Sequence, residues 1–219
     1  MAGLLFTSVG WGNLGLNLGP NPGLDESEVM DRRLKLKESL ALRELIFMKQ
    51  THSARVQRVD SHSKNVDADA IFTSEKSVGL VALAADCLPI LIRSEGLVAA
   101  IHAGRVGVSN SIISHTISAM SNAGGKNFEA IIGPSICVDC YEVSPEMYES
   151  YVADFPHAAT TQTQHCLDLQ SAAASELLSA GVEVHNLGIC TREYSEFYSH
   201  RRSTQEGGHE GRQAGVIFL

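Results

Sequence analysis

A chain of 219 residues, of which 44% are hydrophobic and 19% charged, has the size and composition of one globular domain. Its formal net charge of −8 argues against non-specific binding to nucleic acid or to anionic membranes. No apolar run approaches the roughly 20 residues of a membrane-spanning helix, and the N-terminal stretch lacks the basic region of a signal peptide. We therefore expect a single cytoplasmic domain over residues 1–219, with five reduced cysteines.

Strands and helices alternate along the first half of the chain. Residues 4–9 read as a strand and are followed by a loop over 10–24 that is rich in Gly, Asn and Pro. Asp25 and Glu26 then open a helical pattern, because acidic residues suit the positive end of a helix. The middle of the chain predicts strands at 45–49, 56–59, 69–73, 78–85, 89–93 and 97–102. Several are apolar throughout, which is typical of strands buried on both faces.

The second half contains longer helices between fewer strands. Residues 107–122 predict one helix, ended by a glycine pair, and a strand follows at 128–132. Ser144 before Pro145 is a good helix start, an N-cap followed by a first-turn proline. A further helix is expected over 168–180, and strands at 182–187 and 214–219 close the chain. The irregular order excludes a regular βαβ repeat, so we predict an α/β domain rich in strands.

Three strand ends each deliver a residue able to bind a metal ion. These residues are His52, Cys87 and His102. Two imidazoles and one thiolate suit tetrahedral zinc, and three protein ligands leave a fourth position for water or substrate. The spacings of 35 and 15 residues match no local zinc motif, however, and each residue alone is more often structural. The sequence raises a shared metal site only as a hypothesis.

Other polar clusters are open to two interpretations. Asp67 and Asp69 share a strand face and either orient a ligand histidine or mark a solvated strand start. Cys137 and Cys140 form a CxxC motif without a second CxxC, and we expect no redox role for it. A basic cluster at 199–202 and Arg212 either bind phosphate or lie free on the surface. We assign no role to the six other histidines, His62, His115, His157, His165, His185 and His209.

Taken together, short stretches over nearly the whole chain resemble one family. It is the laccase-domain or polyphenol oxidase family of YfiH type, whose members are described as purine nucleoside phosphorylases with adenosine deaminase activity. The matching stretches are Leu16-Asn17-Leu18-Gly19, Lys49-Gln50-Thr51-His52, Asp67-Ala68-Asp69-Ala70, Ala85-Asp86-Cys87-Leu88-Pro89-Ile90, His102-Ala103-Gly104, Ile132-Gly133-Pro134-Ser135-Ile136, Cys140-Tyr141-Glu142-Val143, Cys190-Thr191, Ser199-His200-Arg201-Arg202 and Gly211-Arg212.

The resemblance implies a fold, an activity and a set of site residues. The fold is a single α/β domain of layered mixed sheets flanked by helices, likened to cysteine-hydrolase-like folds. The activity is zinc-dependent phosphorolysis of purine nucleosides with adenosine deamination. His52, Cys87 and His102 would be catalytic metal ligands, supported from behind by Asp69 and Asp86. The substrates would be small molecules, a nucleoside and phosphate, and the expected phosphate or substrate contacts are Lys49, Arg105, Arg202 and Arg212.

The sequence departs from the family pattern at three places. After Gly104 the usual Trp-Arg-Gly is replaced by Arg105-Val106-Gly107, so the arginine is displaced by one position and the aromatic residue is missing. The usual Gly-Pro-Cys-Ile-Gly reads Gly-Pro-Ser-Ile-Cys at 133–137, and the helix after Asp168 has three alanines where an arginine is often found. These changes spare the metal ligands but affect the purine pocket and the phosphate contacts.

Three other functions compete with the phosphorylase. A copper-dependent polyphenol oxidase is disfavoured, because a multicopper centre needs many histidines and this chain has nine, with no His-x-His pair. A metal-free thiol hydrolase would use Cys87 as nucleophile and His102 as base. A non-catalytic metal- or partner-binding domain is the third alternative. The expected cofactor is zinc, with copper as the alternative.

Overall fold

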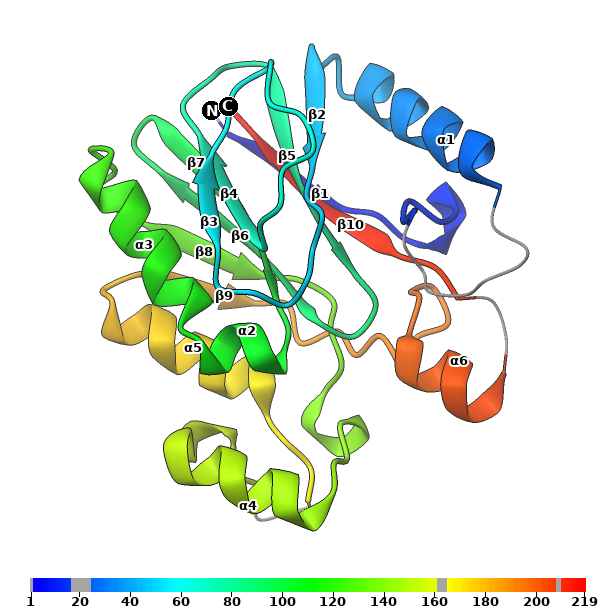
Figure 1. Cartoon of the computed structure of the whole chain (residues 1–219), viewed down its shortest axis with the longest axis vertical. Helices are drawn as coiled ribbons and strands as arrows, with labels where there is room; N and C mark the ends of the chain where they lie inside the picture. The colour runs from blue at the N-terminus through cyan, green and yellow to red at the C-terminus, as the bar shows by residue number, and fades with distance from the viewer. Residues whose placement is uncertain (1, 17–24, 161–164, 208–209) are drawn as a thin grey trace.

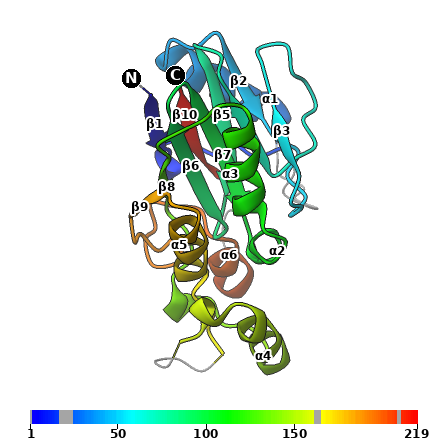
Figure 2. The same ribbon diagram turned by 90° about the vertical axis from the view of Figure 1, so that its left-hand side faces the viewer.

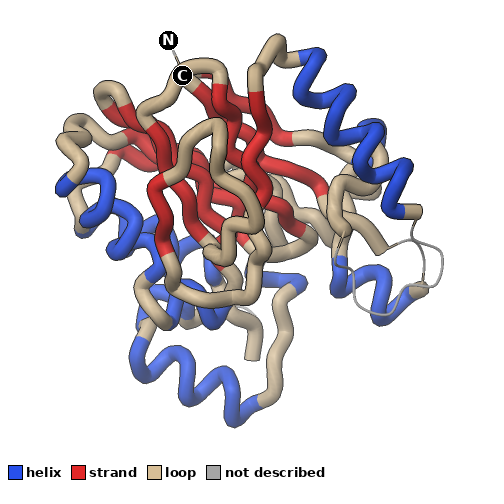
Figure 3. Tube along the Cα trace, turned by 45° about the horizontal axis from the view of Figure 1, so that its top comes forward, coloured by secondary structure: helices blue, strands red, loops and turns tan. Residues whose placement is uncertain are grey.

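The structure is a computed structural model that describes residues 2–16, 25–160, 165–207 and 210–219. Its strands form two sheets, which lie together at the centre of the molecule while helices lie outside them (Figure 3). The four-stranded sheet has the order β1 (Gly3–Phe6), β10 (Gln213–Phe218), β5 (Val78–Ala84) and β2 (Glu44–Phe47). Only the β2–β5 pair in this sheet is parallel.

The six-stranded sheet has the order β3 (Val56–Arg58), β4 (Ala70–Thr73), β7 (Leu97–Ala103), β6 (Leu88–Ser94), β8 (Glu129–Ile132) and β9 (Glu183–Asn186). The outer pairs β3–β4 and β8–β9 are parallel, and the inner pairs are antiparallel. Both sheets are therefore mixed, as the family resemblance implied.

The two sheets pack face to face, which explains the continuous apolar runs of the central strands. Successive strand residues point to opposite faces. In β6, Leu91 belongs to the core between the sheets, whereas Ile90 and Ile92 pack beneath the helices on the outer face. In β5, Leu80 faces the core between the sheets and Val81 faces the other side. Each central strand is thus buried on both faces, as its sequence predicted.

Helices cover the outer faces of both sheets (Figure 1). Helix α1 (Glu26–Ser39) packs Leu36 against the four-stranded sheet. On the other side, α2 (Arg105–Ser109), α3 (Ile112–Asn122) and α5 (Leu169–Ser179) cover the six-stranded sheet, with α3 in front of β7 in Figure 2. Helix α4 (Pro145–Asp154) lies at the end of the molecule away from the termini, and α6 (His200–Glu206) precedes β10. Short 3-10 helices occupy Val9–Trp11, Val138–Cys140 and Pro156–Ala158.

The predicted elements are confirmed with small shifts and one correction. Asp25 caps α1 by accepting hydrogen bonds from Ser27 and Glu28, and Ser144 caps α4. The single helix predicted over 107–122 is wrong: it is two helices, broken where Ser111 takes the left-handed conformation with φ of 59°. The first strand ends at Phe6 and not at residue 9. Residues 17–19 of the Leu16–Gly19 motif and His209 lie outside the described residues.

No helix among the described residues is both long and apolar enough to cross a bilayer.

Candidate active site

The structure brings the three predicted ligands, His52, Cys87 and His102, to one place, called here the His–Cys–His cluster. Cys87 Sγ lies 3.7 Å from His52 Nε2, and one donor atom from each residue lies within 4.8 Å of the others. The two imidazole rings meet edge to face, with 4.8 Å between their centres. His52 is exposed, Cys87 is half-buried and His102 is buried, so the cluster is open on one side.

The sheet topology explains why residues so far apart in sequence converge. His52 lies in the connection from β2 to β3 and Cys87 in the turn from β5 to β6, so both follow a strand of the four-stranded sheet. His102 lies near the end of β7 in the other sheet, where it pairs with Pro89 of β6. This register places Cys87, two residues before Pro89, beside the end of β7. The cluster therefore forms where the chain crosses between the sheets.

Gly104, directly after β7, leaves the space in which the cluster sits. A Cβ atom at this position would lie 2.7 Å from His52 Cδ2 and 3.0 Å from Cys87 Sγ. Such a contact would push the imidazole and the sulfur out of place. The donor set of two nitrogens and one sulfur is the type that zinc binds, with an open fourth position. Together, the free space and the donor chemistry fit a metal ion of this kind.

Asp69 is the buried anchor of the cluster. Its carboxylate lies 2.9 Å from His102 Nδ1 and accepts hydrogen bonds from the backbone N–H groups of Thr51, His52 and Ser53. It is fully buried, and its backbone carbonyl also accepts from the His102 N–H. With Nδ1 held by Asp69, the Nε2 atom of His102 is left for the metal. The hydrogen bonds also stabilise His52 in a left-handed conformation with φ of 59°.

Asp86 supports the cluster in a different way from Asp69. It also has a left-handed backbone, with φ of 84°, directly before Cys87. Its carboxylate accepts hydrogen bonds from the Thr191 hydroxyl at 2.6 Å and from the Arg201 N–H at 2.7 Å. Asp86 thus fastens the Cys87 turn to the start of α6. Within the described part of the chain, its carboxylate bonds to Thr191 and Arg201 and not to His52, Cys87 or His102. Asp67, the other acid of the motif, pairs with Arg55 near the surface.

The electrostatics of the cluster favour a thiolate. Burial opposes ionisation of Cys87, but the positive charge of His102 outweighs it and lowers the pKa of the thiol to about 6. Burial likewise opposes charge on His102, yet Cys87 and Asp69 raise its pKa to about 9. Although Asp69 is itself desolvated, hydrogen bonds from His102 and Ser53 hold its pKa well below the usual range. At neutral pH the sulfur is therefore already in the form that binds metals.

A cavity of about 600 Å³ opens over the His–Cys–His cluster. Cationic or titratable side chains from three distant segments line it: Arg33, Lys49, His200 and Arg212. Arg33 donates two hydrogen bonds to the Leu14 carbonyl and stacks 3.8 Å above the Phe47 ring. Arg212 and His200 both contact the Glu210 carboxylate. Lys49 is exposed, and no ion pair is formed by its ammonium with the described residues. A metal-type cluster and several cations thus share one cavity.

The other two predicted arginines lie elsewhere. The Arg202 guanidinium donates hydrogen bonds to the carbonyls of Thr191, Arg192, Tyr194 and Phe197, so it holds the loop before α6 together. Arg105 begins α2, and its charge opposes the rise that burial causes in the pKa of Tyr141. Neither residue is among those that line the cavity.

Sequence reasoning missed three features of the site. His200 received no role of its own beyond the basic cluster, although it lines the cavity. Arg33 is the second: it lines the cavity, and its position among the apolar residues of α1 was a usable signal. Gly104 is the third. A side chain at this position would collide with His52 and Cys87, but this depends on the register of β6 and β7, which the sequence does not show.

Comparison with known proteins shows the family to which this chain belongs. A family model described as multi-copper polyphenol oxidoreductase laccase matches residues 10–219. The chain belongs to this family. A purine nucleoside phosphorylase of Corynebacterium glutamicum is 34% identical, over 93% of this chain and 86% of that protein. Another purine nucleoside phosphorylase, from Streptomyces coelicolor, is 32% identical over 93% of this chain and 88% of that protein. These matches confirm the resemblance found in the sequence.

The fold of this family is also confirmed by a solved structure. The protein YfiH of Bacillus licheniformis superposes with a TM-score of 0.83, over 100% of this chain and 92% of that one, at 23% sequence identity. At that identity the likeness concerns the fold alone. The layered mixed sheets flanked by helices are therefore those of a YfiH-type domain.

Proposed function

We propose that this chain is a zinc-dependent purine nucleoside phosphorylase that also deaminates adenosine. One observation carries the proposal: a single cavity combines an open His–Cys–His cluster with cations suited to an anionic co-substrate. Relatives more than 30% identical over most of the chain are named purine nucleoside phosphorylases. A cavity of about 600 Å³ lies within the range of small-molecule sites.

In phosphorolysis, a phosphate oxygen attacks C1′ of the ribose while the bond from C1′ to the purine nitrogen breaks. The base leaves with the electron pair of that bond and must gain a proton. Lys49 and Arg212 line the cavity and are suited to hold the phosphate. We assign the proton donor to His200, whose Nδ1 lies 3.1 Å from Glu210 and whose Nε2 makes no hydrogen bond to the residues that the structure describes.

In deamination, water adds at C6 of adenine and ammonia leaves. A zinc ion, when bound, supplies a Lewis acid that activates water and stabilises developing negative charge. The chain would hold the metal through His52, Cys87 and His102. Asp69 keeps a proton at Nδ1 of His102 and thereby orients the ring.

The test uses the purified protein with adenosine or inosine, with and without phosphate. We expect free base and ribose 1-phosphate when phosphate is present, and inosine from adenosine in either case. Cys87→Ala, which removes one ligand, should abolish both activities. If wild type forms none of these products above the level of Cys87→Ala, the proposal is wrong.

A variant of Lys49 tests the phosphate contact separately. Loss of a charged hydrogen bond is worth about 1.5–3 kcal/mol, so Lys49→Ala should raise KM for phosphate roughly tenfold or more. Lys64→Ala is the matched control, because Lys64 pairs with Glu44 and lies outside the cavity. An unchanged KM in Lys49→Ala would remove Lys49 from the phosphate site.

A copper-dependent oxidase is the second candidate, and the description of the family model favours it. Two histidines and one cysteine also occur as ligands of single copper ions. Among the described residues, however, His52 and His102 are the only histidines in groups able to hold a metal, too few for several copper ions. Oxygen consumption with a phenol, dependent on copper and lost in His52→Ala, would favour the oxidase over the phosphorylase.

A further inference from the structure

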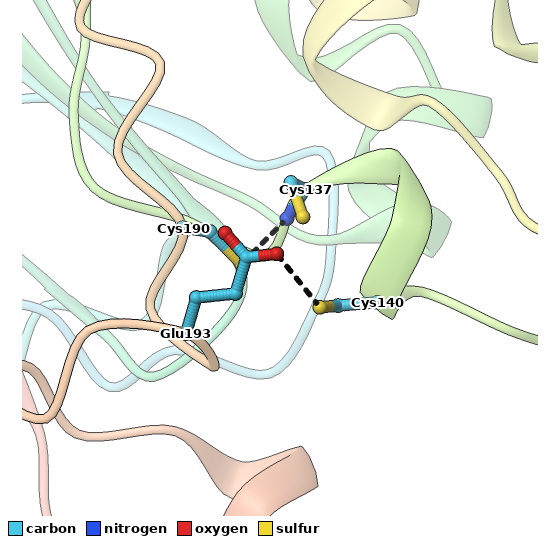
Figure 4. Close-up of side chains that lie close together, drawn as sticks. All are labelled: Cys137, Cys140, Cys190 and Glu193. Carbon is cyan, nitrogen blue, oxygen red and sulfur yellow. Dashed lines mark hydrogen bonds between the residues drawn. The ribbon is translucent and has the colours of Figure 1, made fainter.

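A second group of metal-ligand side chains lies outside the His–Cys–His cluster. It consists of Cys137, Cys140, Cys190 and Glu193, called here the three-cysteine cluster (Figure 4). One sulfur or carboxylate oxygen from each residue lies within 4.8 Å of all the others. Cys140 and Cys190 are buried, Cys137 is half-buried, and Glu193 reaches in from an exposed position. The sequence pattern showed only the CxxC half of this group.

Two short turns present the four donors as two matched pairs. Cys137 precedes and Cys140 ends the 3-10 helix at Val138–Cys140, where the Cys140 N–H bonds to the Cys137 carbonyl. Cys190 and Glu193 have the same spacing in a turn that the Tyr194 N–H closes on the Cys190 carbonyl. A donor pair separated by two residues is the usual spacing in structural zinc sites. The second pair escaped the sequence pattern because it ends in glutamate and not in cysteine.

The backbone holds the two turns against one another. Ser135 and Cys190 form a parallel β-bridge, with hydrogen bonds from Ser135 N–H to the Ile189 carbonyl and from Thr191 N–H to the Ser135 carbonyl. The bridge fixes the first turn beside the second before any metal binds. The arrangement of the donors is thus preorganised by secondary structure.

The donor distances suit a tetrahedral ion. With metal–sulfur bonds of about 2.3 Å, the sulfurs of such a site lie roughly 3.8 Å apart. Cys140 Sγ already lies 3.8 Å from a Glu193 carboxylate oxygen, and the Cys137 N–H points at Cys190 Sγ at 3.4 Å. Only small side-chain movements are needed to bring all four donors around one ion.

We propose that the three-cysteine cluster is a second metal site, which binds a thiophilic divalent ion such as zinc in a structural role. Four protein donors fill a tetrahedral shell, so no position is left for substrate. The ion would join the loop after β8 to the loop after β9. Thr191, next to Cys190, holds Asp86 behind the Cys87 turn, so the second site would brace one wall of the active site.

The test counts metal ions in purified chains that were grown and handled with zinc and without chelator. We expect Cys87→Ala, which lacks a ligand of the first cluster, to retain about one zinc per chain. Adding Cys137→Ser to that variant should remove it. Cys137 is the least buried of the three cysteines, so its substitution disturbs the packing least. Circular dichroism shows whether the double variant is folded. The matched control is Cys166→Ser, since Cys166 is a buried cysteine outside both clusters and should leave the metal count unchanged.

Cobalt gives a second readout that does not depend on activity. The Cys87→Ala protein loaded with Co²⁺ should show an intense sulfur-to-cobalt charge-transfer band. Adding Cys137→Ser should weaken this band. Adding Glu193→Gln should keep the band but shift the visible absorption of the cobalt ion. Because these measurements use the first-cluster variant, they stand even if the phosphorylase proposal fails. Absence of metal and of this band in folded Cys87→Ala would overturn the second site. So would a disulfide among the three cysteines, detected as two missing thiols in unreduced, denatured protein.

Discussion

At the scale of single residues, the geometry of the candidate active site depends on one buried carboxylate and on one position without a side chain. Asp69 accepts hydrogen bonds from three backbone N–H groups, and Gly104 leaves open the space beside His52 and Cys87. Neither residue would bind the metal. Both set the position of the atoms that would.

Gly104→Ala should therefore weaken metal binding at the His–Cys–His cluster without unfolding the protein. The added Cβ would stand 2.7 Å from the His52 ring, and the exposed ring can swing away. We expect at least a tenfold loss of metal affinity, measured by competition with a chelator, since even outer contacts of such sites are worth 10–100-fold.

Gly107→Ala is the matched control for this change. Its Cβ would have no neighbour closer than 3.5 Å, and Gly107 lies within α2, where alanine is the better helix former. Metal affinity should be unchanged and the protein slightly more stable. Equal metal affinity in the two alanine variants would show that Gly104 does not shape the site.

The Cys87 thiol gives a second test at this scale. In metal-free protein its alkylation rate should rise with a midpoint near pH 6, because His102 lowers its pKa to about 6. An ordinary cysteine titrates near pH 8.5. Bound zinc should protect the thiol from alkylation, whereas a metal-free hydrolase would react stoichiometrically in the presence of zinc. Mass spectrometry of the modified peptide distinguishes the two outcomes.

At the scale of elements, the sequence predicts strands and helices well and their contacts poorly. The apolar runs of β5, β6 and β7 identified strands buried on both faces, and the capping residues Asp25 and Ser144 marked two helix starts. The break at Ser111 was missed because the apolar pattern of α3 gives no sign of the left-handed residue that precedes it.

The site residues show the same limit. His52, Cys87 and His102 were named as ligands through family resemblance, because their spacing matches no local motif. Their convergence depends on the pairing of β6 with β7 and on the crossing between the sheets. Arg202 illustrates the reverse case: its motif predicted a phosphate contact, but four carbonyl groups occupy its guanidinium.

Arg202→Ala should accordingly lower stability and leave phosphate binding unchanged. Removing the guanidinium leaves carbonyl groups without partners in a loop packed beside α6, which costs about 2 kcal/mol. Urea unfolding measures the loss. The neighbouring Arg201→Ala is the control, because its backbone N–H still binds Asp86 and its side chain only approaches the Tyr141 ring at 5.5 Å. A raised KM for phosphate with unchanged stability in Arg202→Ala would restore its predicted role.

At the scale of the whole molecule, Asp69 connects the two sheets. The backbone groups that it binds follow β2 of the four-stranded sheet, and His102 belongs to β7 of the six-stranded sheet. The same carboxylate thus orients a residue of the His–Cys–His cluster and ties the two layers together. Its ionisation should then contribute to the stability of the entire fold, and the sign of that contribution follows from its pKa.

Hydrogen bonds hold the pKa of Asp69 below its unfolded value, which is about 3.9. Its stabilising contribution is therefore complete above that value and is lost as pH falls toward the lower pKa of the folded state. In metal-free protein, Asp69→Asn should be markedly less stable than wild type at pH 6, and the gap in unfolding free energy should narrow below pH 4. Asp67→Asn, which alters only a surface pair with Arg55, should show almost no gap at either pH. Urea unfolding curves at pH 6 and below pH 4 measure this gap. If the gap in unfolding free energy for Asp69→Asn stays constant with pH, the charge of Asp69 does not hold the two sheets together.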